Sequence, residues 1–94
     1  MAVFNGHAFA GGLIMGLAHD FRIMTNDSKK KLCLSEINLG FNMPKGYNAL
    51  VGATVTKKAF RNLALGTQMT PQEALKDEVV DNLFNGPEDC EKQI

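Results

Sequence analysis

The 94-residue chain lacks several features that would assign it to a specialised class of protein. It has no tryptophan, only two cysteines, Cys33 and Cys90, and ten basic side chains against ten acidic ones. Two distant cysteines without nearby histidines do not have the spacing of a zinc site, so no metal is expected. We interpret both as reduced thiols of an intracellular protein. The balanced charge provides no overall field that would attract nucleic acid or anionic lipid.

Long apolar runs are also missing. The longest is interrupted by Gly16 and followed by His19 and Asp20, so the sequence predicts no membrane-spanning segment. The first residues lack the basic region of a secretory signal. Hydrophobic residues make up 45% of the chain, which is typical of a small globular protein.

The spacing of apolar residues predicts short strands alternating with helices, and therefore an α/β fold. Strands are expected at 2–4, 21–24, 32–34 and 79–80, and helices at 12–18, 45–55, 57–65 and 71–76. The clearest local signal is Thr70-Pro71-Gln72-Glu73, which predicts a capped helix start. Pro87 indicates a last helix of less than two turns.

Two adjacent glycines, Gly11 and Gly12, stand at the start of the helix expected at 12–18. The first N–H groups of a helix have no partner within it and favour negative charge, and glycine leaves room for a ligand oxygen beside them. A backbone oxyanion hole is built in this way. Close packing of a strand against a helix also requires glycine, and the local sequence alone favours that interpretation.

Glu36 follows the apolar strand expected at 32–34. A carboxylate between apolar residues can be partly buried and can transfer protons. A solvated glutamate at a strand end needs no function, and the local pattern favours this second interpretation. The two histidines, His7 and His19, have no serine or cysteine with a matching acid at a readable spacing, so a hydrolase triad has no support.

Three stretches in order resemble the crotonase family, the enoyl-CoA hydratases and isomerases. They are NGHAFAGGLIMGLAHDFRIM from residue 5, SEINLGF from residue 35 and LGTQMTPQEALKDEVVD from residue 65. The resemblance implies that Gly11, flanked by Ala10 and Gly12, presents its N–H to a thioester oxygen, and that Glu36 is catalytic. It implies further that Gly12 and Gly16 let the helix lie tightly on its neighbours. It thus reverses both local interpretations.

The sequence departs from the family pattern at two positions. The first of the two glutamates that hydratases use falls on Ile14, which is expected to line the substrate site. An apolar residue there, with Glu36 retained, resembles the Δ3,Δ2-enoyl-CoA isomerases. Glu78 stands where the family usually has glycine, and it is strained if its φ is positive. The resemblance implies a coenzyme A thioester as substrate and no metal or redox cofactor.

The family's domain is well over twice as long as this chain. The resemblance therefore implies that residues 1–94 are the central-to-C-terminal part of a crotonase-like spiral fold, without its N-terminal half and C-terminal helices. It further implies a homo-oligomer for the full-length protein and a peroxisomal or mitochondrial location, although no targeting signal is visible. Two alternatives remain open: a truncated, non-catalytic relative or interaction fragment, and a hydratase whose first acid is supplied otherwise.

Overall fold

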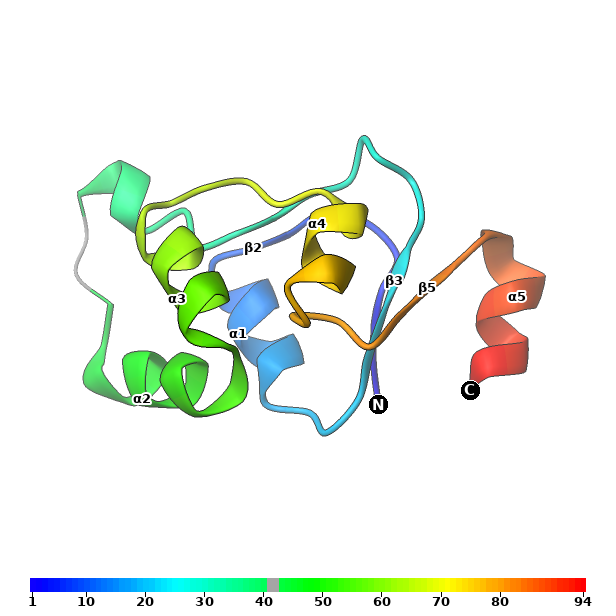
Figure 1. The fold of residues 1–94 in the computed structure, drawn as a ribbon, viewed down its shortest axis with the longest axis horizontal. Helices are drawn as coiled ribbons and strands as arrows, with labels where there is room; N and C mark the ends of the chain where they lie inside the picture. The colour runs from blue at the N-terminus through cyan, green and yellow to red at the C-terminus, as the bar shows by residue number, and fades with distance from the viewer. Residues whose placement is uncertain (41–42) are drawn as a thin grey trace.

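The computed structural model describes residues 1–40 and 43–94, and it contains short strands flanked by helices (Figure 1). The elements are β1 (Ala2–Phe4), β2 (Ala8–Phe9), α1 (Gly11–Leu17), β3 (Arg22–Thr25), β4 (Leu32–Cys33), the 3₁₀ helix η1 (Ile37–Leu39), α2 (Lys45–Thr54), α3 (Lys57–Ala64), α4 (Pro71–Lys76), β5 (Asn82–Phe84) and α5 (Gly86–Gln93). The expected α/β class is confirmed, as are the four helices expected between residues 12 and 76.

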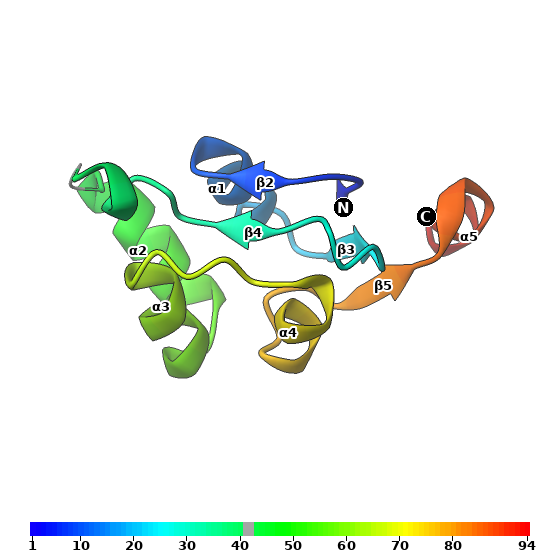
Figure 2. The same ribbon diagram turned by 90° about the horizontal axis from the view of Figure 1, so that it is seen from above.

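Two small parallel sheets organise the chain. One has the strand order β1-β3-β5 and the other pairs β2 with β4 (Figure 2). Met69 extends the second sheet through an antiparallel bridge to Leu32. Each pass of the chain adds one parallel strand beside the strand of the pass before it. The chain therefore winds as a spiral, with α1 linking the first pass to the second.

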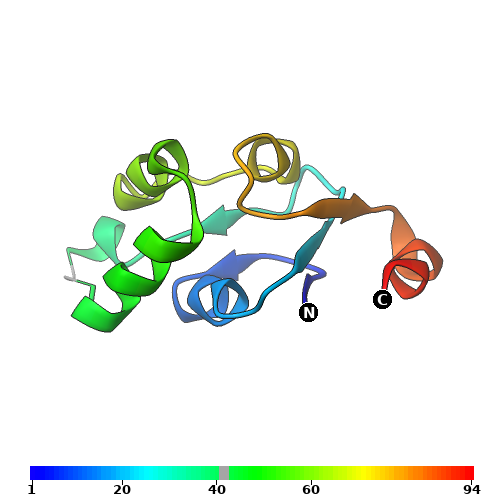
Figure 3. The same ribbon diagram turned by 60° about the horizontal axis from the view of Figure 1, so that its bottom comes forward.

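Helix α1 supplies a large part of the hydrophobic core. Leu13 and Leu17 lie on one helical face, as their spacing predicts, and both are buried together with Ile14. The core they join also contains Phe4, Ala8, Met24, Leu32, Leu34, Val51, Ala59, Leu63, Met69, Ala74, Val79, Val80. Helices α2 and α3 cover one end of the molecule, whereas α5 lies at the other end, beyond β5 (Figure 3).

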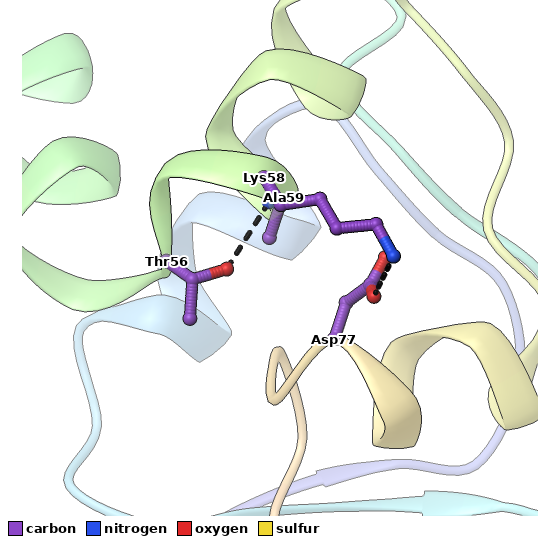
Figure 4. A network of polar contacts seen from close by, with 4 residues as sticks. All are labelled: Thr56, Lys58, Ala59 and Asp77. Carbon is purple, nitrogen blue, oxygen red and sulfur yellow. Dashed lines mark hydrogen bonds and ion pairs between the residues drawn. The ribbon is translucent and has the colours of Figure 1, made fainter.

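Two polar contacts involve α3, of which one caps its start and the other joins it to the end of α4. The Thr56 hydroxyl oxygen accepts a hydrogen bond from the Ala59 N–H at 3.2 Å and caps the helix start. The Lys58 ammonium lies 3.3 Å from the Asp77 carboxylate at the end of α4 (Figure 4). The Lys58 side chain is 56% exposed, so this ion pair contributes at most about 1 kcal/mol. It orients α3 and α4 more than it stabilises them.

The strand expected at 79–80 is wrong. Val79 and Val80 are buried in the turn after α4, and both of their N–H groups donate to the Ala74 carbonyl, at 2.8 and 3.3 Å. Their apolar character reflects packing at a helix end, and the strand β5 starts only at Asn82. Glu78 has φ 61°, so the condition for strain at this non-glycine residue is met.

Two further elements, one strand and one helix, differ from the sequence-based expectation. The two-residue strand β2 was not predicted, since it is defined by its pairing with β4 rather than by its own pattern. Helix α5 has eight residues and therefore exceeds two turns. Asp89 explains part of this length, because its carboxylate accepts a hydrogen bond from the Asn85 N–H at 2.8 Å and stabilises the first turn.

Gly16 is required where α1 crosses β1. A Cβ added there would clash with the Cζ and Cε1 atoms of the Phe4 ring, whereas a Cβ added at Gly12 meets nothing within 4 Å. We expect Gly16→Ala to lower the free energy of unfolding by about 1–3 kcal/mol. The matched Gly12→Ala should raise it by up to about 1 kcal/mol, because alanine favours helix. Urea unfolding of the two variants tests this, and equal stabilities would contradict the assigned contact.

Candidate active site

The N-terminus of α1 is open. No hydrogen bond among residues 1–40 and 43–94 uses the N–H of Gly11 or Gly12, and both glycines are exposed. The capping residue, Ala10, has φ 55° and ψ −122°, an unusual conformation for a residue with a Cβ. Two backbone bonds hold it: the Ala10 N–H donates to the Cys33 carbonyl at 2.9 Å, and the Ile14 N–H donates to the Ala10 carbonyl at 3.1 Å. The strained backbone thus presents two free N–H donors.

Packing within the described residues does not explain the glycine pair. A Cβ added at Gly11 or Gly12 meets no atom within 4 Å, in contrast to Gly16. The expected tight packing of Gly12 is therefore wrong for this part of the chain, and that of Gly16 is confirmed. Each glycine costs a helix about 1 kcal/mol relative to alanine. Within the described residues, room beside the free N–H groups is the physical reason that is left for glycine here.

Glu36 lies in the turn between β4 and η1, three residues beyond the end of the strand at Cys33. Its side chain is half-buried, as expected for a candidate proton-transfer group. The Oε2 atom is fully buried and has no hydrogen-bond partner among the described residues. An unsatisfied buried acceptor costs about 1–3 kcal/mol, so such an atom requires an explanation.

The strand pairing brings Gly11 and Glu36 to the same edge of a sheet. In the β2–β4 pair, Phe9 lies opposite Cys33. Both strands run in the same direction (Figure 2), so α1 and the turn with Glu36 both follow carboxyl ends of neighbouring parallel strands. Ligands of open α/β sheets bind at this edge. Within residues 1–40 and 43–94, free N–H donors and a buried carboxylate oxygen without a hydrogen-bond partner therefore lie on the same side of the sheet.

Ile14, which is expected to line the substrate site, lies on α1 just after the free N–H groups, and its role there stays a prediction. Its side chain is 6% exposed and belongs to the hydrophobic core, one turn after Ala10. It offers neither a proton acceptor nor a donor. The three expected motifs contain several carboxylates. Among the described residues, only that of Glu36 lies at this edge of the sheet.

Cys33 is a neighbour of Glu36 that the sequence did not single out. Its buried thiol donates to the Gly66 carbonyl at 3.4 Å. Burial raises the pKa of the Cys33 thiol, and the negative charge of Glu36 raises it further. Gly66 and Asn38 complete this cluster, because the Asn38 amide donates to the same carbonyl at 3.1 Å. Residues 28 or more positions apart meet here, and no local sequence signal indicates that.

The Cys33 thiol can therefore report on the Glu36 carboxylate. We expect Glu36→Gln to lower the pKa of the Cys33 thiol, because the variant removes the second cause of its raised value. The pH dependence of Cys33 alkylation, measured in a Cys90→Ser background, gives this pKa. Glu88→Gln, which alters an exposed carboxylate on α5, is the matched control and should have no effect. An unchanged thiol pKa in Glu36→Gln would show that the carboxylate does not lie beside Cys33.

The other described features of the chain do not form a second candidate functional site. Within residues 1–40 and 43–94, no three histidine, cysteine, aspartate or glutamate side chains are grouped to hold a metal ion. No helix among these residues has the length and hydropathy to cross a bilayer. Two open cavities of about 240 and 390 Å³ lie between α2 and α3 and between β5 and α5, and neither is lined by Gly11 or Glu36.

Comparison with known proteins decides the family. Residues 1–93 match the family described as enoyl-CoA hydratase/isomerase. The chain belongs to the enoyl-CoA hydratase/isomerase family. The peroxisomal enoyl-CoA delta isomerase 2 of Arabidopsis thaliana is 40% identical over 84 residues, which cover 87% of this chain and 35% of that protein. The mitochondrial enoyl-CoA delta isomerase 1 of Mus musculus is 37% identical over 90 residues, or 95% of this chain and 30% of that protein.

Solved structures of this family have the same fold. The crystal structure of human mitochondrial delta3-delta2-enoyl-CoA isomerase matches with a TM-score of 0.77 and 31% identity, over 85% of this chain and 31% of that one. The crotonase-like fold expected from the sequence is thereby confirmed. The chain spans about a third of the length of each of these relatives.

Proposed function

We propose that this chain carries the oxyanion donor and the proton-transfer carboxylate of an enoyl-CoA isomerase site. The observation that carries the proposal is the buried, unpartnered Oε2 atom of Glu36, at the sheet edge where the Gly11 N–H is also free. A carboxylate oxygen without a hydrogen-bond partner among the described residues keeps its lone pairs for a proton. The names of the relatives from Arabidopsis thaliana and Mus musculus support a delta isomerase over other members of the family.

The reaction needs only these two groups from the chain. The thioester oxygen accepts a hydrogen bond from Gly11, between Ala10 and Gly12. Glu36 removes a proton from C2 of a 3-enoyl-CoA, and the electrons move into the thioester to form a dienolate, which the oxyanion donor stabilises. Glu36 then returns the proton to C4, which leaves the double bond between C2 and C3. No metal or redox cofactor takes part in these steps.

Ile14 favours isomerisation over hydration. Adding water to a double bond requires a group that positions the water and a group that delivers a proton, and the family's hydratases use two glutamates for these tasks. Isoleucine does neither, and an apolar side chain at this position offers no hydrogen bond to competing water. Moving a double bond requires a single base that takes and returns one proton. Glu36 is sufficient for that reaction.

The remaining parts of the proposal concern the whole protein. Residues 1–94 are the central-to-C-terminal part of the crotonase-like domain, an acyl-CoA is its substrate, and the full-length protein is a homo-oligomer. The location is peroxisomal or mitochondrial, which are the compartments in the names of the relatives from Arabidopsis thaliana and Mus musculus. A non-catalytic relative is the second candidate, because the chain spans only about a third of those proteins.

A chimeric protein tests the proposal. In a chimera, residues 1–94 replace the matched segment of the Mus musculus delta isomerase, which supplies the other two thirds. We expect the chimera to convert 3-enoyl-CoA to 2-enoyl-CoA, and the 94-residue chain alone to be inactive. A folded chimera without isomerase activity would favour the non-catalytic relative, and turnover by the isolated chain would show that it holds a complete site.

A further inference from the structure

The carbonyl of Gly66 links the end of α3 to the segment that carries Glu36 through hydrogen bonds. Helix α3 ends in a Schellman motif, in which Gly66 donates to Leu63 at 3.0 Å and Thr67 donates to Asn62 at 3.2 Å. Gly66 has φ 72°, as this motif requires. Its own carbonyl accepts hydrogen bonds from the Asn38 amide at 3.1 Å and from the Cys33 thiol.

The Asn38 side chain packs closely against the backbone of Gly66. A Cβ added at Gly66 would clash with Oδ1 and with Cγ of Asn38, the latter at 2.9 Å, and would lie 3.0 Å from Nδ2 in a tight contact. Glycine is favoured here by φ, and a side chain at this position would also force the Asn38 amide to move away from the Gly66 carbonyl. A fit of this kind fixes the distance between two segments that are remote in sequence.

Asn38 also belongs to the same closed turn as Glu36. The Asn38 N–H donates to the Ser35 carbonyl at 3.1 Å, and the Leu39 N–H donates to the Glu36 carbonyl at 3.1 Å. The backbone on either side of Glu36 is therefore bonded to the segment from which the Asn38 amide reaches Gly66. A displacement of Asn38 displaces the backbone of Glu36 with it.

We propose that Asn38 is a positioning residue, which ties the Glu36 turn to the Gly66 carbonyl and thereby holds the carboxylate in place. Its importance for the reaction rests on the proposed function, but its effect on the position of Glu36 does not. Asn38 is exposed on the surface, so the loss of its hydrogen bond should cost the fold little. Catalysis is more sensitive, because a misplacement of about 1 Å can cost 10²-fold in rate.

The first test measures the position of the carboxylate without any activity. In the 94-residue chain with Cys90→Ser, the change in the Cys33 thiol pKa caused by Glu36→Gln is measured with and without Asn38→Ala. We expect Asn38→Ala to remove about half of that change or more, since the two residues are coupled. Asn48→Ala on α2 is the matched control and should leave the change intact. Asn38→Leu, similar in size but without a donor, replaces Asn38→Ala if that variant does not fold.

The second test measures the reaction in the chimera. Asn38→Ala should lower kcat for isomerisation by about tenfold or more and leave KM within about twofold, as expected for a misplaced base in an intact binding site. An unchanged thiol coupling, or an unchanged kcat in an active chimera, would overturn the proposal. If the coupling is lost but no chimera isomerises, the positioning role stands and the proposed function fails.

Discussion

Glu36→Gln in the chimera is expected to abolish isomerisation, with a loss of at least about 10³ in kcat. A positioned general base contributes about 10²–10⁴-fold, and in the proposed mechanism the same group both takes the proton from C2 and returns it at C4. Glutamine keeps the shape of glutamate but accepts no proton. The measurement is the rate of conversion of 3-enoyl-CoA to 2-enoyl-CoA, with Glu88→Gln on α5 as the matched control that should retain full activity.

Binding should survive this substitution. Because glutamine fills the same space, we expect the dissociation constant of 2-enoyl-CoA to change by no more than about threefold, or less than 1 kcal/mol. Loss of turnover with intact binding separates a catalytic role from a structural one. Full activity of Glu36→Gln would eliminate Glu36 as the base, whereas loss of both binding and turnover would indicate that the variant distorts the site.

Gly11→Val is expected to lower kcat of the chimera by about 10²–10³, which is the measured cost of removing one oxyanion donor in a well-studied enzyme. Among the described residues of this chain, a Cβ at position 11 meets no atom within 4 Å, so we expect the valine to act through the space that the thioester oxygen would occupy. Gly46→Val is the matched control, since Gly46 also lies in the first turn of a helix and has nothing within 4 Å. Equal activities of the two variants would show that the Gly11 N–H is not an oxyanion donor.

Local sequence signals predict the helices well because their causes are local. Thr70 and Glu73 form the expected capping box, with both reciprocal hydrogen bonds present. The positive φ of Glu78 also follows from its place just after a helix. The strand at 79–80 fails for the opposite reason, because only the packing against the end of α4 distinguishes a buried turn from a buried strand.

The candidate site is less predictable than the helices from the amino-acid sequence alone. The motifs indicate Gly11 and Glu36, but only the parallel pairing of β2 with β4 brings them to one edge. The unpartnered Oε2 of Glu36 and the fit of Asn38 to Gly66 depend on contacts between remote segments. A single sequence contains no pattern from which such pairs can be read.

The ratio of isomerisation to hydration in the chimera tests the central claim most directly. The chimera is given 3-enoyl-CoA and 2-enoyl-CoA in separate assays, and the formation of 2-enoyl-CoA and of 3-hydroxyacyl-CoA is measured. With Glu36 as the single carboxylate and isoleucine at position 14, we predict that isomerisation exceeds hydration by at least about 10², the smaller contribution of one general acid or base. Hydration equal to or faster than isomerisation would contradict the account.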